Sequence, residues 1–173
     1  MAFIVEDGTG LSTATSYESV AGADAYVSEF MNSNASWAGD ATAKQNALII
    51  GTAYLDNRYR LRWEGCRTFR EQALAFPRMH ICDYDGYAVD ANSVPVLVKR
   101  ATVEAAVRFL TSGVVLEPDD LTADGSVKRL SQRFDVFSRS IEYVGAKGTQ
   151  PTFSKIDRLL GYLVIQGNTV ERG

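Results

Sequence analysis

The chain has 173 residues, of which 46% are hydrophobic and 23% are charged, and its formal net charge at pH 7 is −3. This length suits one domain that can bury a core without disulfides or a bound metal. The composition excludes collagen-like, mucin-like and coiled-coil proteins, and two cysteines are too few for a disulfide scaffold. An acidic balance also disfavours a simple basic nucleic-acid binder.

The first residues carry no positively charged stretch followed by a long apolar run, which a signal peptide requires. No apolar run approaches the roughly 20 residues that a helix needs to cross a bilayer. We therefore expect a soluble globular protein that is made in the cytoplasm and has no membrane partner.

Charge alternates along the chain in four blocks. Residues 1–57 and 81–125 carry net charges of −6 and −5, whereas residues 58–80 and 126–173 each carry +4. Such blocks can pair within one fold or between neighbouring subunits, and ordinary surface patterning also produces them. A head-to-tail assembly would use the asymmetry, because it joins two different faces of each subunit.

Residues 1–18 are predicted to form an N-terminal arm, in which the small polar residues 6–16 make an extended segment or loop. A helix is expected over residues 19–31, with Ser19 as its N-cap and apolar side chains at helical spacing after it. Trp37 follows in a connection, where we expect it to fill part of the core.

A second helix is predicted over residues 42–57. Thr42 and Gln45 match the capping-box pattern at its start. Gly51 lies in the middle of this helix and costs about 1 kcal/mol relative to alanine. We therefore expect this glycine to allow the close approach of another helix.

Three further features are predicted before residue 113. A short helix is expected at residues 69–75, ending before a proline, because the residue that precedes proline is disfavoured in helices. Asp85-Gly86 indicates a turn, and a third long helix is expected over residues 95–112. The three long helices are predicted to share one core with six buried side chains: Tyr26, Phe30, Ile50, Tyr54, Val103 and Val107.

The C-terminal third is predicted to be less helical. Residues 113–150 form a loop and a β element, with strand-like alternation that suggests a hairpin. Residues 151–173 form a last helix, capped by Thr152, and a polar tail. The fold class is therefore mainly α: one domain over residues 1–173, with a helical core at 19–112, about four helices, and a short β hairpin before the C-terminal helix.

His80 is the only histidine, so any catalytic triad or Cys–His dyad would have to include it. Cys82, Asp83 and Asp85 lie near it and could ligate a metal, but no second histidine or Cys-x-x-Cys pair completes a zinc spacing. A polar turn is the simpler interpretation, so we predict no catalytic residue, no cofactor and no metal site. Cys66 and Cys82 are expected to be reduced thiols, with a structural bridge as the alternative.

The segment that follows the second helix combines arginines with aromatic residues. It could pair with acidic blocks of the same chain or of a neighbouring subunit, it could follow a nucleic-acid backbone and stack bases, or it could be a solvated face. The net acidic charge favours the first of these. The candidate residues for a subunit interface or a DNA-facing surface are Arg58, Arg60, Arg62, Arg67 and Arg70.

The first two thirds of the chain contain a series of short motifs whose order and spacing are specific, although no single motif is diagnostic. The motifs are Val5-Glu6-Asp7-Gly8-Thr9-Gly10, Ser16-Tyr17, Ala23-Asp24-Ala25-Tyr26, Trp37, Ala53-Tyr54-Leu55-Asp56, Arg58-Tyr59-Arg60, Gln72-Ala73-Leu74-Ala75-Phe76-Pro77-Arg78, Asp85-Gly86-Tyr87, Val94-Pro95 and Lys99-Arg100-Ala101-Thr102. In this series the chain resembles the head-tail adaptor proteins of tailed bacteriophages, also called connector or head-completion proteins. Close relatives are often labelled DnaT-like single-stranded-DNA-binding proteins. The resemblance covers about residues 1–112; beyond them only the general plan is similar.

The resemblance implies a structural protein of the phage neck, located in the virion, with no catalytic activity. It implies a homo-oligomeric ring, usually of twelve copies, that binds the portal protein and receives the tail or a tail-terminator (stopper) protein. Genomic double-stranded DNA would pass through the channel of this ring. The alternative function is a single-stranded-DNA-binding or replication accessory protein, which salt-dependent binding to oligonucleotides would reveal.

Overall fold

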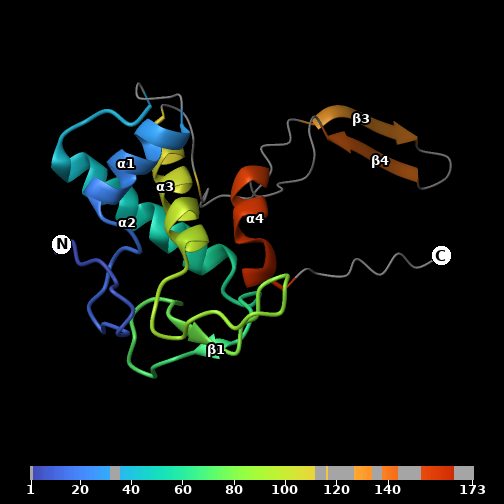
Figure 1. The fold of residues 1–173 in the computed structure, drawn as a ribbon. Helices are drawn as coiled ribbons and strands as arrows, with labels where there is room; N and C mark the ends of the chain where they lie inside the picture. The colour runs from blue at the N-terminus through green and yellow to red at the C-terminus, as the bar shows by residue number, and fades with distance from the viewer. Residues whose placement is uncertain are drawn as a thin grey trace. The chain divides into compact units, whose positions relative to one another are not determined.

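The computed structural model describes residues 2–31, 36–111, 116, 127–133, 138–143 and 153–165. Its helices and strands, in chain order, are α1 (Val20–Phe30), α2 (Ala41–Arg58), β1 (Cys66–Arg67), β2 (Arg78–Met79), α3 (Val96–Leu110), β3 (Val127–Arg133), β4 (Ser138–Tyr143), α4 (Ser154–Leu160) and the 3-10 turn η1 (Gly161–Leu163) (Figure 1). The predicted fold class is confirmed, because helices dominate the described residues and a hairpin precedes the last helix. None of the described helices combines the length and apolar character needed to cross a membrane.

The chain forms two compact units, one made of residues 1–116 and 153–173 and the other of residues 117–152. The second unit contains β3 and β4, which pair antiparallel with Leu130 opposite Ile141. This pair is the β hairpin that the alternation of the sequence predicted. The first unit holds the four helices and the short β1–β2 pair, which the sequence had not indicated.

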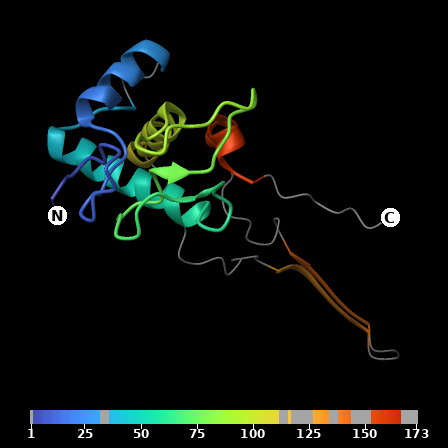
Figure 2. The same cartoon turned by 60° about the horizontal axis from the view of Figure 1, so that its bottom comes forward.

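Within the first unit, α3 is the central helix (Figures 1 and 2). It packs against α1, α2 and α4, and every residue from Ala101 to Val107 is buried. One apolar cluster joins α2, α3 and α4 to the segment after α2, with Tyr59, Trp63 and Phe76 among its members. A second cluster joins α1, α2 and α3: Ala23, Val27, Trp37, Ala47, Leu48, Val103, Ala106 and Val107. Trp37 therefore fills the core as predicted.

The starts of the helices follow local capping chemistry, with one error in the prediction. Ser19 caps α1 as predicted, because its hydroxyl accepts the Gly22 N–H at 3.0 Å. The predicted capping box at Thr42 is wrong: Asp40 is the N-cap of α2, and its carboxylate accepts the Ala43 N–H at 2.7 Å. Helix α4 has Phe153 at its N-cap position, and the predicted cap at residue 152 lies outside the described residues.

Three of the six side chains predicted to be buried are buried, namely those of Tyr54, Val103 and Val107, and Tyr26 is half-buried. The prediction of burial is wrong for Phe30 and Ile50, whose side chains have exposed fractions of 53% and 36%. Phe30 is the last residue of α1, where it stacks on Tyr26 and lies under Arg100 instead of entering the core. Ile50 lies in α2 but belongs to neither apolar cluster.

The short helix predicted at residues 69–75 is not present, because this segment forms turns. The buried side chain of Gln72 organises them: its carbonyl oxygen accepts the Phe69 N–H, and its amide donates to the carbonyl oxygens of Leu74 and Pro77. The Phe76–Pro77 peptide bond is cis. A side chain thus supplies the hydrogen bonds that a helical backbone would have made.

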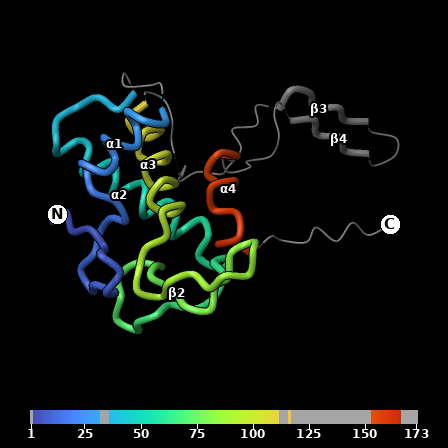
Figure 3. The backbone as a smooth tube through the Cα atoms, in the orientation of Figure 1, coloured from blue at the N-terminus to red at the C-terminus, as the bar shows by residue number. Residues whose placement is uncertain are grey.

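The predicted N-terminal arm is a loop within the first unit, in which a β-bridge joins Val5 to Ser16 (Figure 3). Glu6 is buried, and its carboxylate accepts the backbone N–H groups of Gly8, Gly10 and Leu11, each at 2.9 Å. Tyr17, at the end of this loop, is fully buried in the first apolar cluster. A carboxylate that holds three N–H groups fixes a turn that small residues alone would leave flexible.

Candidate functional site

The five arginines predicted as interface or DNA-facing residues do not share one environment. Arg58 is half-buried at the end of α2, whereas Arg60, Arg62, Arg67 and Arg70 are exposed on the segment that follows. Their neighbours divide them into a structural pair, a pair that lines a pocket, and Arg70, which forms an exposed ion pair with Glu71 at 3.9 Å.

Arg58 and Arg62 lie on the side of this segment that faces the C-terminal helix. Their guanidinium carbons are each 5.8 Å from the centre of the Tyr59 ring. The Tyr59 hydroxyl donates to Asp157 of α4 at 2.5 Å, and burial together with this bond raises the pKa of Tyr59. The backbone carbonyl of Arg62 also accepts the Ile165 N–H at 2.7 Å. These two arginines therefore help to hold the C-terminal segment in place.

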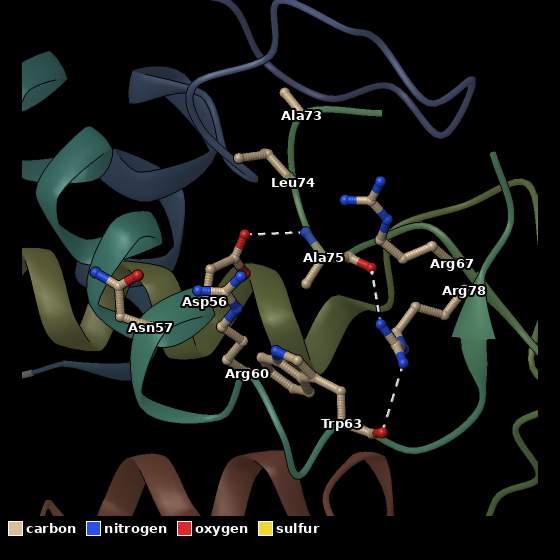
Figure 4. A pocket seen from close by; sticks show the side chains of 9 residues that line it. All are labelled: Asp56, Asn57, Arg60, Trp63, Arg67, Ala73, Leu74, Ala75 and Arg78. Carbon is tan, nitrogen blue, oxygen red and sulfur yellow. Dashed lines mark hydrogen bonds between the residues drawn. The ribbon is translucent and has the colours of Figure 1, made fainter. Parts of the chain in front are cut away.

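Arg60 and Arg67 line a pocket of about 380 Å³ at the end of α2 (Figure 4). Among the described residues, no carboxylate lies within ion-pair distance of either guanidinium. Arg67 donates to the backbone carbonyl of Arg70 at 2.6 Å. The lining residues come from α2, the turn after it, β1, the 73–75 turn and β2: Asp56, Asn57, Arg60, Trp63, Arg67, Ala73, Leu74, Ala75 and Arg78.

Arg78 forms the structural side of the pocket. Its guanidinium group donates to the backbone carbonyls of Glu64 and Gly65, each at 2.7 Å. It makes longer bonds to the backbone carbonyls of Trp63 and Ala75, which Figure 4 shows as dashed lines. Burial lowers the pKa of Arg78, although an arginine stays protonated at neutral pH. Its donors are thus directed at backbone carbonyls, and it joins the segment after α2 to β2.

Asp56 forms the acidic wall of the pocket. Its carboxylate accepts the Tyr17 hydroxyl at 2.5 Å and the Ala75 N–H at 2.9 Å, and the Tyr17 oxygen accepts the Phe76 N–H at 3.2 Å. Burial raises the pKa of Asp56 to about 6, against the opposing effect of these hydrogen bonds and of the nearby arginines. Sequence reasoning missed this pair, because Tyr17 and Asp56 are 39 residues apart and no local pattern links them.

The aromatic residues of the basic segment are not available for stacking. Tyr59 and Trp63 have exposed fractions of only 1% and 4% and lie in the first apolar cluster. The indole Nε1 of Trp63 is buried, and among the described residues it finds no hydrogen-bond acceptor. Phe69 is the exposed aromatic residue of the segment, at 39%.

The polar group around His80 forms a turn. His80 is exposed with φ of +63°, and Asp83 accepts the backbone N–H groups of Asp85 and Tyr87 at 3.0 and 2.9 Å, which confirms the predicted turn. Within the described part of the chain, no three His, Cys, Asp or Glu side chains are grouped as metal ligands. Cys66 and Cys82 are exposed and unbonded, so the alternative of a disulfide between them is wrong for this structure.

Comparison with known protein families places the chain in one of them. A family model described as "Putative DnaT-like ssDNA binding protein" matches residues 1–173. The chain belongs to this family. The match extends the DnaT-like relationship over residues 113–173, where the motif series had ended, and it carries no statement about a phage neck. No curated protein and no solved structure matches the DnaT-like chain significantly.

Proposed function

We propose that this DnaT-like protein binds single-stranded DNA without catalysing a reaction, and that Arg60 and Arg67 contact the DNA backbone. The family description supports DNA as the ligand. The observation that carries the proposal is that both guanidinium groups are exposed at one pocket and no described carboxylate pairs with them. Exposed arginines that pair with no carboxylate are the groups that bind phosphate oxygens most readily.

Binding to a fluorescein-labelled oligothymidylate, followed by anisotropy at several salt concentrations, tests this proposal. Each phosphate contact contributes roughly −0.7 to the slope of log K against log salt for a single strand. The double variant Arg60→Gln, Arg67→Gln should therefore bind more weakly and with a shallower slope. Arg158→Gln, an exposed arginine on α4, is the matched control. Absence of binding by the wild-type protein at low salt would overturn the proposal.

A second candidate is the structural neck protein of a tailed phage, a ring of about twelve copies between the portal protein and the tail or a stopper protein, through which genomic double-stranded DNA passes. The series of motifs over residues 1–112 supports it. One observation of the structure also favours it: Tyr59 and Trp63 are buried, so the basic segment cannot stack bases on them, and the chain is acidic overall. The exposed arginines would then contact a neighbouring subunit.

Two measurements separate the candidates. A neck protein is present in purified particles at a copy number near that of the portal protein, whereas a replication accessory protein is absent from them. Sedimentation of the purified chain with and without the portal protein gives an independent measurement, because a neck protein forms a ring on its partner. If neither oligonucleotide binding nor particle incorporation is observed, both candidates fail.

A further inference from the structure

The pocket at the end of α2 has a composition that neither the family description nor the motif series explains. Three of its lining side chains are arginines and one is a carboxyl group, in a volume of about 380 Å³. Arg78 donates to backbone carbonyls and Asp56 accepts from Tyr17 and Ala75, so both are fixed by the fold. Arg60 and Arg67 are left to face a ligand, since the one hydrogen bond of Arg67 to the Arg70 carbonyl leaves its other donors available.

A buried donor lies in the wall of the same pocket. Trp63 is 96% buried, since its exposed fraction is 4%, and its indole N–H finds no acceptor among the described residues. Figure 4 shows the indole nitrogen at the end of the ring that lies toward Arg60. A buried N–H group without an acceptor is costly, and most such groups in proteins are paired with protein or water. This donor would gain a partner from a ligand oxygen.

We propose that the pocket between Arg60, Trp63 and Arg67 binds one phosphate group. In the cell this phosphate belongs to the DNA strand, and that part of the inference rests on the proposed function. The two guanidinium groups supply planar donors that match phosphate oxygens. A displacement of the exposed Arg60 side chain gives a third oxygen access to the Trp63 indole N–H.

The net charge of the lining side chains agrees with an anionic ligand. The three arginines outweigh the one carboxyl group of Asp56, whose oxygens already accept two hydrogen bonds from the protein. A cation at the Asp56 carboxyl group would be repelled by the three arginines that line the same pocket. A neutral ligand would leave Arg60 and Arg67 without an anionic partner. A phosphate group offers acceptor oxygens to both guanidinium groups at once.

The two tryptophans allow a direct test by ¹H–¹⁵N correlation spectroscopy of the indole groups. Trp37 donates to Asp24 at 2.6 Å in the second apolar cluster, away from the pocket lining, and serves as the internal control. Titration with inorganic phosphate should shift the Trp63 indole signal and leave the Trp37 signal in place. The Trp37→Phe variant assigns the two signals.

Variants and alternative ligands test whether the shift of the Trp63 signal comes from phosphate bound by Arg60 and Arg67. Arg60→Gln with Arg67→Gln should weaken the phosphate-induced shift at least tenfold, whereas Arg158→Gln should leave it unchanged. Oligothymidylate should shift the same Trp63 signal. A Trp63 signal that moves with an oligoglutamate peptide but not with phosphate would overturn the proposal, because the ligand would then be an acidic protein segment.

The failure of this inference can be told apart from the failure of the proposed function. Oligonucleotide binding that leaves the Trp63 signal unmoved and survives loss of Arg60 and Arg67 would overturn the phosphate pocket while DNA binding stands. A phosphate-induced shift without any oligonucleotide binding would support the pocket and overturn single-stranded DNA as its ligand. No shift with either ligand at millimolar concentration would overturn the pocket itself.

Discussion

Replacing Gly51 by alanine should destabilise the protein, although alanine is the better helix former. A Cβ atom at Gly51 would lie 2.8 Å from the Thr102 carbonyl oxygen and 3.0 Å from the Ala106 nitrogen. Both atoms belong to the backbone of α3, so they cannot move without displacing the central helix. The close approach of α2 and α3 that the sequence predicted at Gly51 is therefore present.

Two opposing effects set the magnitude. Alanine in place of glycine within a helix gains about 1 kcal/mol. Overpacking a tight core costs roughly 1–3 kcal/mol, and we expect the upper half of this range because both obstructing atoms are backbone. The net loss of about 1–2 kcal/mol corresponds to a fall in melting temperature of roughly 2–8 °C for a chain of this size.

Thermal and urea unfolding, followed by circular dichroism, provide the measurement. Ala53→Gly, at an exposed position of the same helix, is the control. It should lose about 1 kcal/mol from helix propensity alone. If Gly51→Ala instead raised the melting temperature by as much as Ala53→Gly lowers it, α2 and α3 would not be in close contact at this point.

Three further predictions concern the core, the acidic wall of the pocket and the single histidine. Val103→Asp should unfold the protein, because a lone buried charge costs several kcal/mol, whereas Val96→Asp at an exposed position should be tolerated, as circular dichroism would reveal. Burial raises the pKa of Asp56 to about 6, so the folded state binds the proton more tightly than the unfolded state does. The free energy of unfolding should therefore fall by roughly 2 kcal/mol as the pH rises from 4 to 6, and Asp56→Asn should flatten this dependence. His80→Ala should leave the fold unchanged, while His80→Gly should raise stability by about 1 kcal/mol, since φ of +63° is unfavourable for residues with a side chain; equal melting temperatures for these two variants would contradict the strain.

The long helices could be predicted because their signals are local. The first helix was expected over residues 19–31 and spans Val20–Phe30, since Ser19 caps it and apolar spacing marks its face. The spacing of apolar residues does not predict, however, whether a neighbouring element extends far enough to bury the last side chain of a helix. Phe30 follows the apolar pattern, but α1 ends there and Arg100 covers the ring instead of the core.

Two of the errors arose where contacts other than helical backbone hydrogen bonds decide the local structure. Residues 69–75 have a helix-compatible composition, yet Gln72 binds backbone groups on both sides and Ala73 donates to the Leu11 carbonyl at 3.1 Å. The pocket shows the same limit. The arginines around it were visible in the sequence, but its acidic wall depends on the contact of Asp56 with Tyr17, which only the folded chain creates.

Some of the arginines stabilise the fold and others are exposed at the pocket, and this difference decides which variants can test DNA binding or subunit contact. Arg78 makes four hydrogen bonds to backbone carbonyls, and Arg58 packs on Tyr59 beside the last helix, so reversing the charge of either would damage the fold before it changed an interface. Loss of activity in such variants would therefore carry no information about DNA or subunit contacts. Arg60 and Arg67 are exposed and pair with no described carboxylate. Neutral substitutions at these two positions change the charge of the surface while leaving the folded core in place, and they bear directly on the ligand of the pocket.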